Sequence, residues 1–213
     1  MIITPLSVGA FQTNCYIVQD DNSTFLIDAP APGEVIINKL KQNKLIPDLL
    51  ILTHGHFDHV LGIKELKKEF PNLKIAISAH DSKYLLDGGD RITRDIAFFN
   101  EDLFYNKMVS YLPVAKADII LKEGDVIKGL TVIETPGHTP GSICLLSDSE
   151  RVLFSGDTLF QSSIGRTDFY NSNYSDMVKS LEKLKSLDDD IIVLPGHGPS
   201  TKIGFEKKNN PYL

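Results

Sequence analysis

Three histidines and an aspartate gather within six positions of one short stretch, Thr53-His54-Gly55-His56-Phe57-Asp58-His59. The apolar run at 47–52 before them is typical of a buried strand, and the apolar spacing at 61–70 predicts a helix after them. We therefore expect these polar residues in a loop at the carboxyl end of a strand, where open α/β sheets place their ligands. Imidazole and carboxylate groups are ligands of zinc, iron and manganese.

The spacing of these donors indicates more than one ion. Alternate side chains of an extended segment point the same way, so His54 and His56 can converge on one metal. Asp58 and His59 lie past the bend and are expected to point to a second position. The alternative is a polar loop whose histidines only form hydrogen bonds. Three histidines in this stretch, in a chain that has six, favour a metal site.

Three further donors stand at the ends of other apolar runs. His138, Asp157 and His197 each follow a predicted strand, and each is flanked by glycine, which lets the backbone turn sharply close to a site. Separate strand ends that all offer ligands are stronger evidence than one motif. His80 also follows a predicted strand but lacks the glycine setting, and we interpret it as structural, at the surface or behind a ligand.

The elements that must position these donors alternate between strands and helices. Apolar runs predict strands at 2–8, 15–18, 24–27, 47–52, 73–78, 130–135, 143–146, 151–155 and 190–194. Turns are expected at 12–14 and 19–22, and amphipathic helices at 35–44 and 174–187. The aromatic-rich segment 81–118 predicts one or two helices that form a cap on the core, and a lid over a substrate pocket is compatible with this interpretation.

Composition narrows the class of protein. The 213 residues carry a formal net charge of −6, which argues against a nucleic-acid partner. The sequence shows no membrane span and no signal peptide at its N-terminus, so we expect a cytoplasmic enzyme. Both cysteines, Cys15 and Cys144, lie in apolar runs and are interpreted as buried thiols. No linker divides the chain, and residues 1–213 are expected to form a single domain.

The string His54-x-His56-x-Asp58-His59, with His138, Asp157 and His197 downstream, resembles the metallo-β-lactamase superfamily. The resemblance covers nearly the whole chain. It implies an α/β fold, the αβ/βα four-layer sandwich, with metals at one edge of two facing sheets. It also implies that His54, His56 and His138 hold one ion, that Asp58, His59 and His197 hold another, and that Asp157 bridges them.

These ligand types suit two divalent metal ions, with zinc as the first candidate and iron or manganese as alternatives. Two such ions about 3.5–4 Å apart bridge a water and lower its pKa towards 7, and the resulting hydroxide attacks a carbonyl. Asp58 is the carboxylate best placed to orient that hydroxide and to accept a proton, so we expect it to be catalytic.

Within the superfamily, three strings are similar to the small glyoxalase II-like hydrolases: Thr13-Asn14-Cys15-Tyr16, Asp157-Thr158-Leu159-Phe160 and Ser163-Ile164-Gly165-Arg166-Thr167-Asp168-Phe169. The likeness implies a small-molecule thioester substrate such as S-lactoylglutathione, cleaved to D-lactate and glutathione. It also implies that Arg166, Phe160 and Ile164 bind the substrate. Arg166 could instead form a structural ion pair with Asp168. The larger glyoxalase II enzymes add a C-terminal helical domain, which is not expected in the short segment after His197, so recognition of glutathione is left open.

Other activities remain as alternatives. A persulfide dioxygenase of the same fold uses one iron, which His54, His138 and Asp157 would hold here by position. A nucleic-acid processing hydrolase is disfavoured by the acidic charge, and a β-lactamase by the lack of a secretion signal. A non-enzymatic binding module is disfavoured because a structural metal needs no bridging carboxylate. The oligomeric state is left open.

Overall fold

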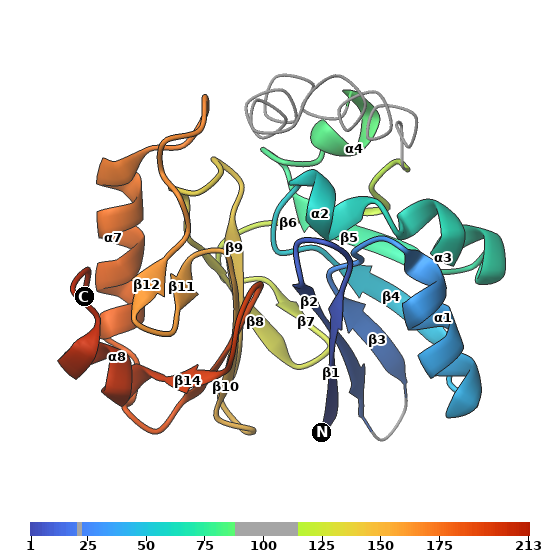
Figure 1. The fold of residues 1–213 in the computed structure, drawn as a ribbon, viewed down its shortest axis with the longest axis horizontal. Helices are drawn as coiled ribbons and strands as arrows, with labels where there is room; N and C mark the ends of the chain where they lie inside the picture. Colours follow the sequence, from blue (N-terminus) through green and yellow to red (C-terminus); the bar gives the residue numbers. More distant parts are fainter. Residues whose placement is uncertain (21–22, 88–114) are drawn as a thin grey trace.

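The computed structural model of the protein describes residues 1–20, 23–87 and 115–213. Two β-sheets face each other, and helices cover the outer face of each sheet, with α1 and α3 on one side and α7 and α8 on the other (Figure 1). This arrangement is the four-layer αβ/βα sandwich that the sequence predicts. None of the helices among these residues combines the length and apolar character that a membrane span requires.

Within the described residues, the first sheet has six strands in the order β1-β2-β3-β4-β5-β6. Strands β1 to β3 pair in antiparallel fashion, whereas β3 to β6 run parallel, because helices connect them. The strands are β1 Ile2–Val8, β2 Thr13–Gln19, β3 Thr24–Ile27, β4 Pro47–Ile51, β5 Lys74–Ser78 and β6 Ile119–Leu121. The helices are α1 Gly33–Gln42, α2 Phe57–Val60, α3 Ile63–Glu69 and α4 Tyr84–Asp87.

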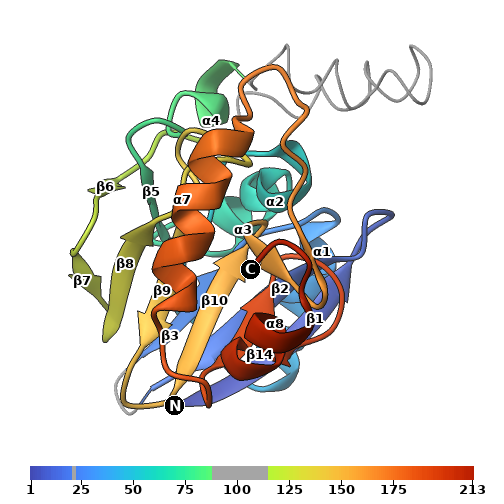
Figure 2. The same ribbon diagram turned by 90° about the vertical axis from the view of Figure 1, so that its left-hand side faces the viewer.

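The second sheet, within the same described ranges, also has six strands, ordered β14-β13-β10-β9-β8-β7. Only β10 and β13 pair in parallel, and α7 connects them (Figure 2). The strands are β7 Val126–Ile127, β8 Leu130–Glu134, β9 Ile143–Ser147, β10 Val152–Gly156, β13 Ile192–Pro195 and β14 Thr201–Lys202. A separate hairpin pairs β11 Leu159–Phe160 with β12 Ser163–Ile164. The helices on this side are α7 Tyr174–Lys185 and α8 Ile203–Asn209.

The central strands of each sheet, such as β2, β3, β9 and β10, are buried on both faces, which explains why they read as continuous apolar runs. Along β2, Tyr16 and Val18 face the second sheet, whereas Cys15 and Ile17 pack towards α1 and α3. This alternation follows from the two-residue repeat of a strand. On the other side of the sandwich, α7 packs on the second sheet through three buried apolar residues, Met177, Leu181 and Leu184.

Most predicted elements are confirmed, with two differences. The predicted turn at 12–14 is wrong, because Thr13 and Asn14 belong to β2 and the turn precedes them at 9–12. The helix predicted after the histidine stretch is two short helices, α2 and α3, and Phe70 caps the second. The helical cap predicted over 81–118 lies mostly outside the described residues. Of this segment the structure describes 81–87, which include α4, and 115–118.

Candidate metal centre

All the predicted donors meet at one edge of the sandwich. The segment after β4 enters α2, and the segments after β8, β10 and β13 reach the same edge from the second sheet (Figure 1). Parallel strands end at the same edge of their sheet. The loop after β4 in the first sheet, and the loops after β10 and β13 in the second sheet, therefore lie at this edge of the sandwich. Residues from both halves of the chain therefore build a shared site.

The first group of donors is His54, His56 and His138, whose ligand atoms lie within 4.8 Å of one another. His54 Nε2 is 3.1 Å from His56 Nδ1, as expected for alternate residues of an extended segment. The His56 and His138 rings stand edge to face with their centroids 4.4 Å apart. Three imidazoles that converge in this way can hold one metal ion.

The second group is Asp58, His59 and His197. His197 Nε2 lies 3.2 Å from Asp58 Oδ2 and 3.3 Å from His59 Nε2. Asp58 and His59 belong to α2, so the turn into this helix separates them from the first group. The structure thus brings the donors together in the two sets that the family resemblance implies.

Asp157 lies between the two groups. Its Oδ2 is 3.5 Å from His138 Nε2 of the first group and 3.4 Å from His197 Nε2 of the second. Its Oδ1 is 3.5 Å from His59 Nε2, and His54, His59 and Asp157 also form a third possible set of donors. A carboxylate in this position can bind two ions at once.

In four of the histidines, the outer ring nitrogen, which points away from the centre, already has a hydrogen-bond partner. His54 Nδ1 lies 3.1 Å from Thr53 Oγ1, and His59 Nδ1 lies 2.8 Å from Asp28 Oδ2. The Nδ1 atoms of His138 and His197 contact backbone oxygens, those of residues 166 and 11, at 2.8 and 3.1 Å. In a neutral histidine whose outer N–H donates, the inner nitrogen keeps its lone pair and can bind a metal at the centre.

Two buried atoms at the centre have no hydrogen-bond partner among the described residues: His138 Nε2 and Asp157 Oδ1. Buried polar atoms are rarely left in this state without a reason such as a bound ion. Both atoms face the other donors, so the residues present fit a metal at this place.

The charges of the two groups differ in the metal-free protein. Burial, reinforced by neighbouring histidines, lowers the pKa of His54 and His56 well below the usual value, so both are neutral ligands. Burial acts in the same direction on His59 and His197, but the nearby carboxylates outweigh it and raise their pKa values to about 9 and about 11. Asp58 and Asp157 therefore attract positive charge to the point where a second cation would bind.

The string Thr13-Asn14-Cys15-Tyr16 supports the segment that carries His197. Asn14 Nδ2 donates to the carbonyls of Pro195 and Gly198 at 2.9 Å, and the Tyr16 hydroxyl donates to Pro195 O at 2.6 Å. Thr13 Oγ1 donates to Asp58 Oδ2 at 2.8 Å. These contacts join β2 to the second donor group, a role that the sequence-based prediction of a turn at 12–14 did not reveal.

We expect Asn14→Ala to lower the free energy of unfolding of the metal-free protein by about 2 kcal/mol, because the buried Asn14 side chain loses its hydrogen bonds to the carbonyls of Pro195 and Gly198. Denaturant unfolding with chelator measures this effect. Asn43→Ala is the matched control, since Asn43 Nδ2 contacts only its own helix, at Lys39 O, and lies at the surface. A change of about 0.5 kcal/mol or less is expected there, and equal losses in the two variants would contradict the role of Asn14.

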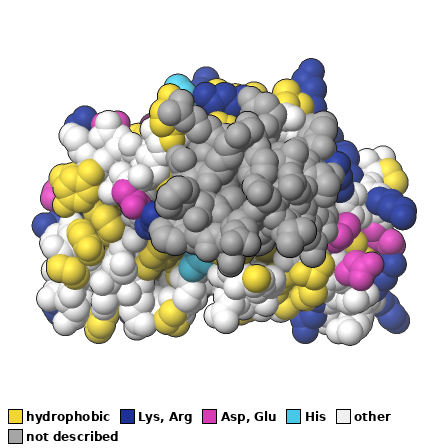
Figure 3. Space-filling view, turned by 45° about the horizontal axis from the view of Figure 1, so that its top comes forward, with side chains coloured by type: hydrophobic (Ala, Val, Ile, Leu, Met, Phe, Trp, Pro, Cys, Tyr) yellow, Lys and Arg dark blue, Asp and Glu magenta, His cyan; other side chains and the backbone are white. Residues whose placement is uncertain are grey.

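A pocket of about 320 Å³ opens over the donors. Figure 3 turns this end of the molecule forward and shows histidine and hydrophobic side chains together at the surface. Besides five of the donors, the pocket is lined by Phe11, Phe57, Phe160, Ile164, Arg166 and Phe169. The predicted substrate residues Phe160, Ile164 and Arg166 thus lie beside the donors. Three phenylalanines were missed, because an isolated aromatic residue in a sequence looks like a core residue.

Arg166 forms the ion pair considered for it and also lies at the rim of the pocket. Its Nε and one terminal nitrogen donate to the Asp168 carboxylate, each at 2.9 Å, so the ion pair is present. Its guanidinium also lies over the Phe169 ring, 4.4 Å from the centroid, at the edge of the pocket. Its backbone carbonyl accepts from His138, so this residue connects the pocket rim to the first donor group.

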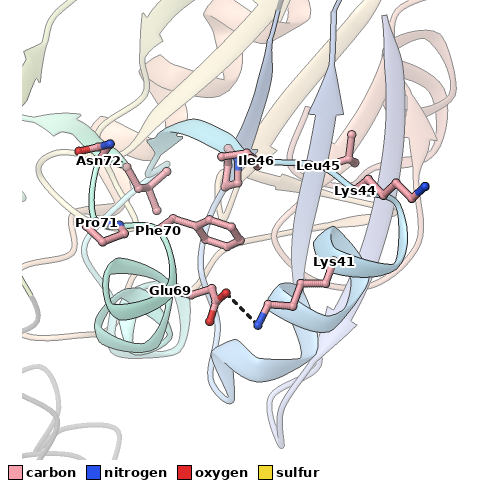
Figure 4. Close-up of a pocket in the computed structure, with 10 residues that line it drawn as sticks. Lys41, Lys44, Leu45, Ile46, Glu69, Phe70, Pro71 and Asn72 are labelled. Carbon is pink, nitrogen blue, oxygen red and sulfur yellow. Dashed lines mark ion pairs between the residues drawn. The ribbon is translucent and has the colours of Figure 1, made fainter.

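Two other features do not belong to the centre. His80 is exposed, as expected for a surface residue. A second hollow lies at the opposite end of the first sheet, where β4 and β5 begin, and Ile46 and Phe70 line it (Figure 4). Its Lys41 and Glu69 form an ion pair of 2.8 Å, and its lining contains no histidine.

Comparison with known proteins agrees with this fold and site. Residues 8–197 match the Metallo-beta-lactamase superfamily, and the chain belongs to that superfamily. It is accordingly a metal-dependent hydrolase of that class, with a histidine and aspartate cluster for divalent ions. The chain is 36% identical to hydroxyacylglutathione hydrolase GloC of Haemophilus influenzae, over 100% of this chain and 98% of the relative.

Two solved structures are similar over nearly their whole length. The protein TTHA1623, solved in a di-iron-bound form, has a TM-score of 0.84 and 31% identity, covering 99% of this chain and 100% of the other. The B3 metallo-beta-lactamase BLEG-1 has a TM-score of 0.86 and 31% identity, and the match covers 100% of this chain and 99% of the other. These likenesses support the sandwich fold and leave the substrate to be argued from the site.

Proposed function

We propose that this chain is a metal-dependent thioester hydrolase of the hydroxyacylglutathione hydrolase type. The observation that carries the proposal is the pocket, in which two donor groups joined by Asp157 open to a surface of aromatic side chains with Arg166 at its rim. The similarity to the Haemophilus influenzae hydrolase supports the choice of a thioester. The substrate is a small molecule, and the enzyme works in the cytoplasm.

In this proposal, His54, His56 and His138 would hold one ion, Asp58, His59 and His197 would hold the other, and Asp157 would serve both. Zinc is the first candidate, with iron as the main alternative, since a similar structure was solved in a di-iron-bound form. When bound, two such ions supply an activated water at neutral pH and polarise the carbonyl that is attacked.

Asp58 is the proposed proton acceptor. Its Oδ2 is fixed by the Thr13 hydroxyl at 2.8 Å, and the residue lines the pocket. In the metal-free protein, the positive charge of His59 and His197 outweighs burial and holds the pKa of Asp58 well below its usual range, so the group is ionised at neutral pH before a metal binds. A positioned carboxylate of this kind can accept the proton of the attacking water and return it to the departing thiolate.

The rest of the pocket is proposed to bind the two halves of the thioester. Phe11 and Phe57 pack edge to face, with centroids 5.1 Å apart, and Phe169 lies 5.5 Å from the His56 ring. These rings can cover the apolar parts of the substrate and exclude water. Arg166 provides a cation for a carboxylate on the thiol half, if the Asp168 ion pair yields to the substrate.

We expect Arg166→Ala to raise KM for S-lactoylglutathione by about 5-fold with little change in kcat, because exposed ion pairs contribute up to about 1 kcal/mol. Asp168→Asn should lower KM, since it releases the guanidinium from its present partner. Arg151→Ala is the control, because Arg151 pairs with Asp188 and Asp190 away from the pocket. Steady-state kinetics with and without added salt measure all three variants, and identical KM values would rule out a substrate role for Arg166.

The function itself is tested with metal-replete protein and a panel of thioesters that includes S-lactoylglutathione, with thiol release as the measurement. We expect hydrolysis that is lost with chelator and restored by zinc or iron. A β-lactam belongs in the panel because BLEG-1 is similar in structure. Intact thioesters, together with oxygen uptake on glutathione persulfide and one iron per chain, would establish the dioxygenase alternative instead.

A further inference from the structure

The β11–β12 hairpin forms part of the pocket wall, and its two strands have only two residues each. Phe160 and Ile164 stand on its two strands, and the chain then continues to Arg166 at the rim. Hairpins this short are not stable alone. At its tip, Ser162 has a φ of 55°, a left-handed conformation that a non-glycine residue rarely adopts unaided. Contacts from outside must therefore define the hairpin.

A buried carboxylate from α8 holds the tip. The Glu206 side chain is fully buried, and its Oε2 accepts from the backbone N–H of Ser162 at 2.8 Å. Its Oε1 accepts from the Thr201 hydroxyl at 2.5 Å. A buried carboxylate is costly unless its oxygens are hydrogen-bonded, so these contacts form a specific arrangement.

A buried amide from the same segment holds the strands. Asn210 Nδ2 donates to Glu206 Oε2 at 2.8 Å and to Ser163 O at 3.1 Å, and Phe160 O lies 3.5 Å from it. Its own Oδ1 accepts from Tyr212 N at 3.1 Å. Figure 1 shows α8 and the C-terminal residues beside the hairpin. One connected polar cluster thus ties the end of the described chain to the pocket wall.

We propose that Glu206 and Asn210 are positioning residues that fix the β11–β12 hairpin and thereby set the affinity for the part of the substrate that touches Phe160 and Ile164. Neither residue lines the pocket or contacts a metal donor. Their effect passes through the backbone of the hairpin alone. The kinetic part of this inference rests on the proposed thioester hydrolysis, whereas the structural part does not.

The test compares Asn210→Ala with Asn209→Ala, a neighbour on the same segment whose Nδ2 contacts only Phe205 O within its own helix. Asn210→Ala should raise KM about 10-fold, since the hydrogen bonds of its amide to Ser163 O and Glu206 Oε2 are lost, with kcat within about twofold and metal content unchanged. Asn209→Ala should behave as the parent protein. Hydrogen exchange by mass spectrometry should quicken at 159–166 in Asn210→Ala and stay unchanged at 54–59.

Substitutions of Glu206 provide a second, independent test of the same proposal. Glu206→Gln keeps an oxygen for Ser162 N and Asn210 Nδ2, and its amide can donate to the Thr201 hydroxyl, so we expect near-normal KM and exchange. Glu206→Leu, of similar volume, should reproduce the effects of Asn210→Ala. Unchanged exchange at 159–166 in both disruptive variants would overturn the proposal, as would loss of kcat and metal together with KM. If the parent cleaves no thioester, the proposed function fails, and the exchange measurements still decide the positioning role.

Discussion

Replacing Asp58 with alanine is expected to lower thioester turnover by about 10²-fold or more while the fold survives. The variant loses one ligand of the second donor group and the carboxylate proposed to accept the proton. Its side chain is 11% exposed and faces the pocket, so its removal leaves no large apolar cavity. The buried core lies away from Asp58. Residues 49–52, for example, pack alternately between the two sheets and against the helices outside the first sheet.

The measurement compares turnover at saturating metal with circular dichroism and the thermal midpoint. Asp48→Ala is the matched control, because Asp48 lies at the start of β4, is exposed, and pairs only with Lys128 at 2.6 Å. Near-normal turnover of Asp58→Ala would show that Asp58 is not part of the catalytic site. A collapse of the thermal midpoint alongside turnover would show that Asp58 supports the fold.

Replacing Asp157 with alanine should remove more metal than any other single change. The parent protein is expected to hold about two ions, because seven donors exceed the four ligands of one tetrahedral site. Asp157 contacts histidines of both groups, at 3.4–3.5 Å, so its loss weakens both sites. We expect fewer than about one ion per chain after dialysis, and turnover close to background.

His197→Ala separates this expectation from a general loss of structure. His197 belongs to the second group only, so its variant should keep about one ion, held by the three histidines of the first group. Elemental analysis and turnover of both variants, with circular dichroism as a check of folding, make the comparison. Equal metal content in the two variants would show that Asp157 does not bridge the groups.

The donors could be predicted from the sequence because each one combines a distinctive side chain with a strand end. His138 and His197 follow buried runs and stand beside glycines, and strand ends that share an edge bring such residues together. No knowledge of distant contacts is needed for that inference. The assignment of residues to two groups came from a family resemblance together with the alternation along 54–59.

The supporting contacts could not be predicted, because they depend on chain segments far apart in sequence. Asn14 looks like a turn residue, and its partners Pro195 and Gly198 are backbone carbonyls, which carry no sequence signal. Phe11 and Phe169 are similarly ambiguous, since aromatic residues fill cores more often than pockets. The Glu206 cluster requires the hairpin and α8 to be placed first.

Each donor group contains residues that follow strands of both sheets, so a bound ion would cross-link the two halves of the sandwich. His54 and His59 follow β4 of the first sheet, whereas His138 and His197 follow strands of the second. An ion bound by both must be released before the layers can separate, so its binding energy adds to folding. At about 100 times its dissociation constant, one ion adds about 2.7 kcal/mol to the free energy of unfolding. Metal supply in the cell would then govern how long this protein persists, and which core substitutions it tolerates, as well as how fast it works.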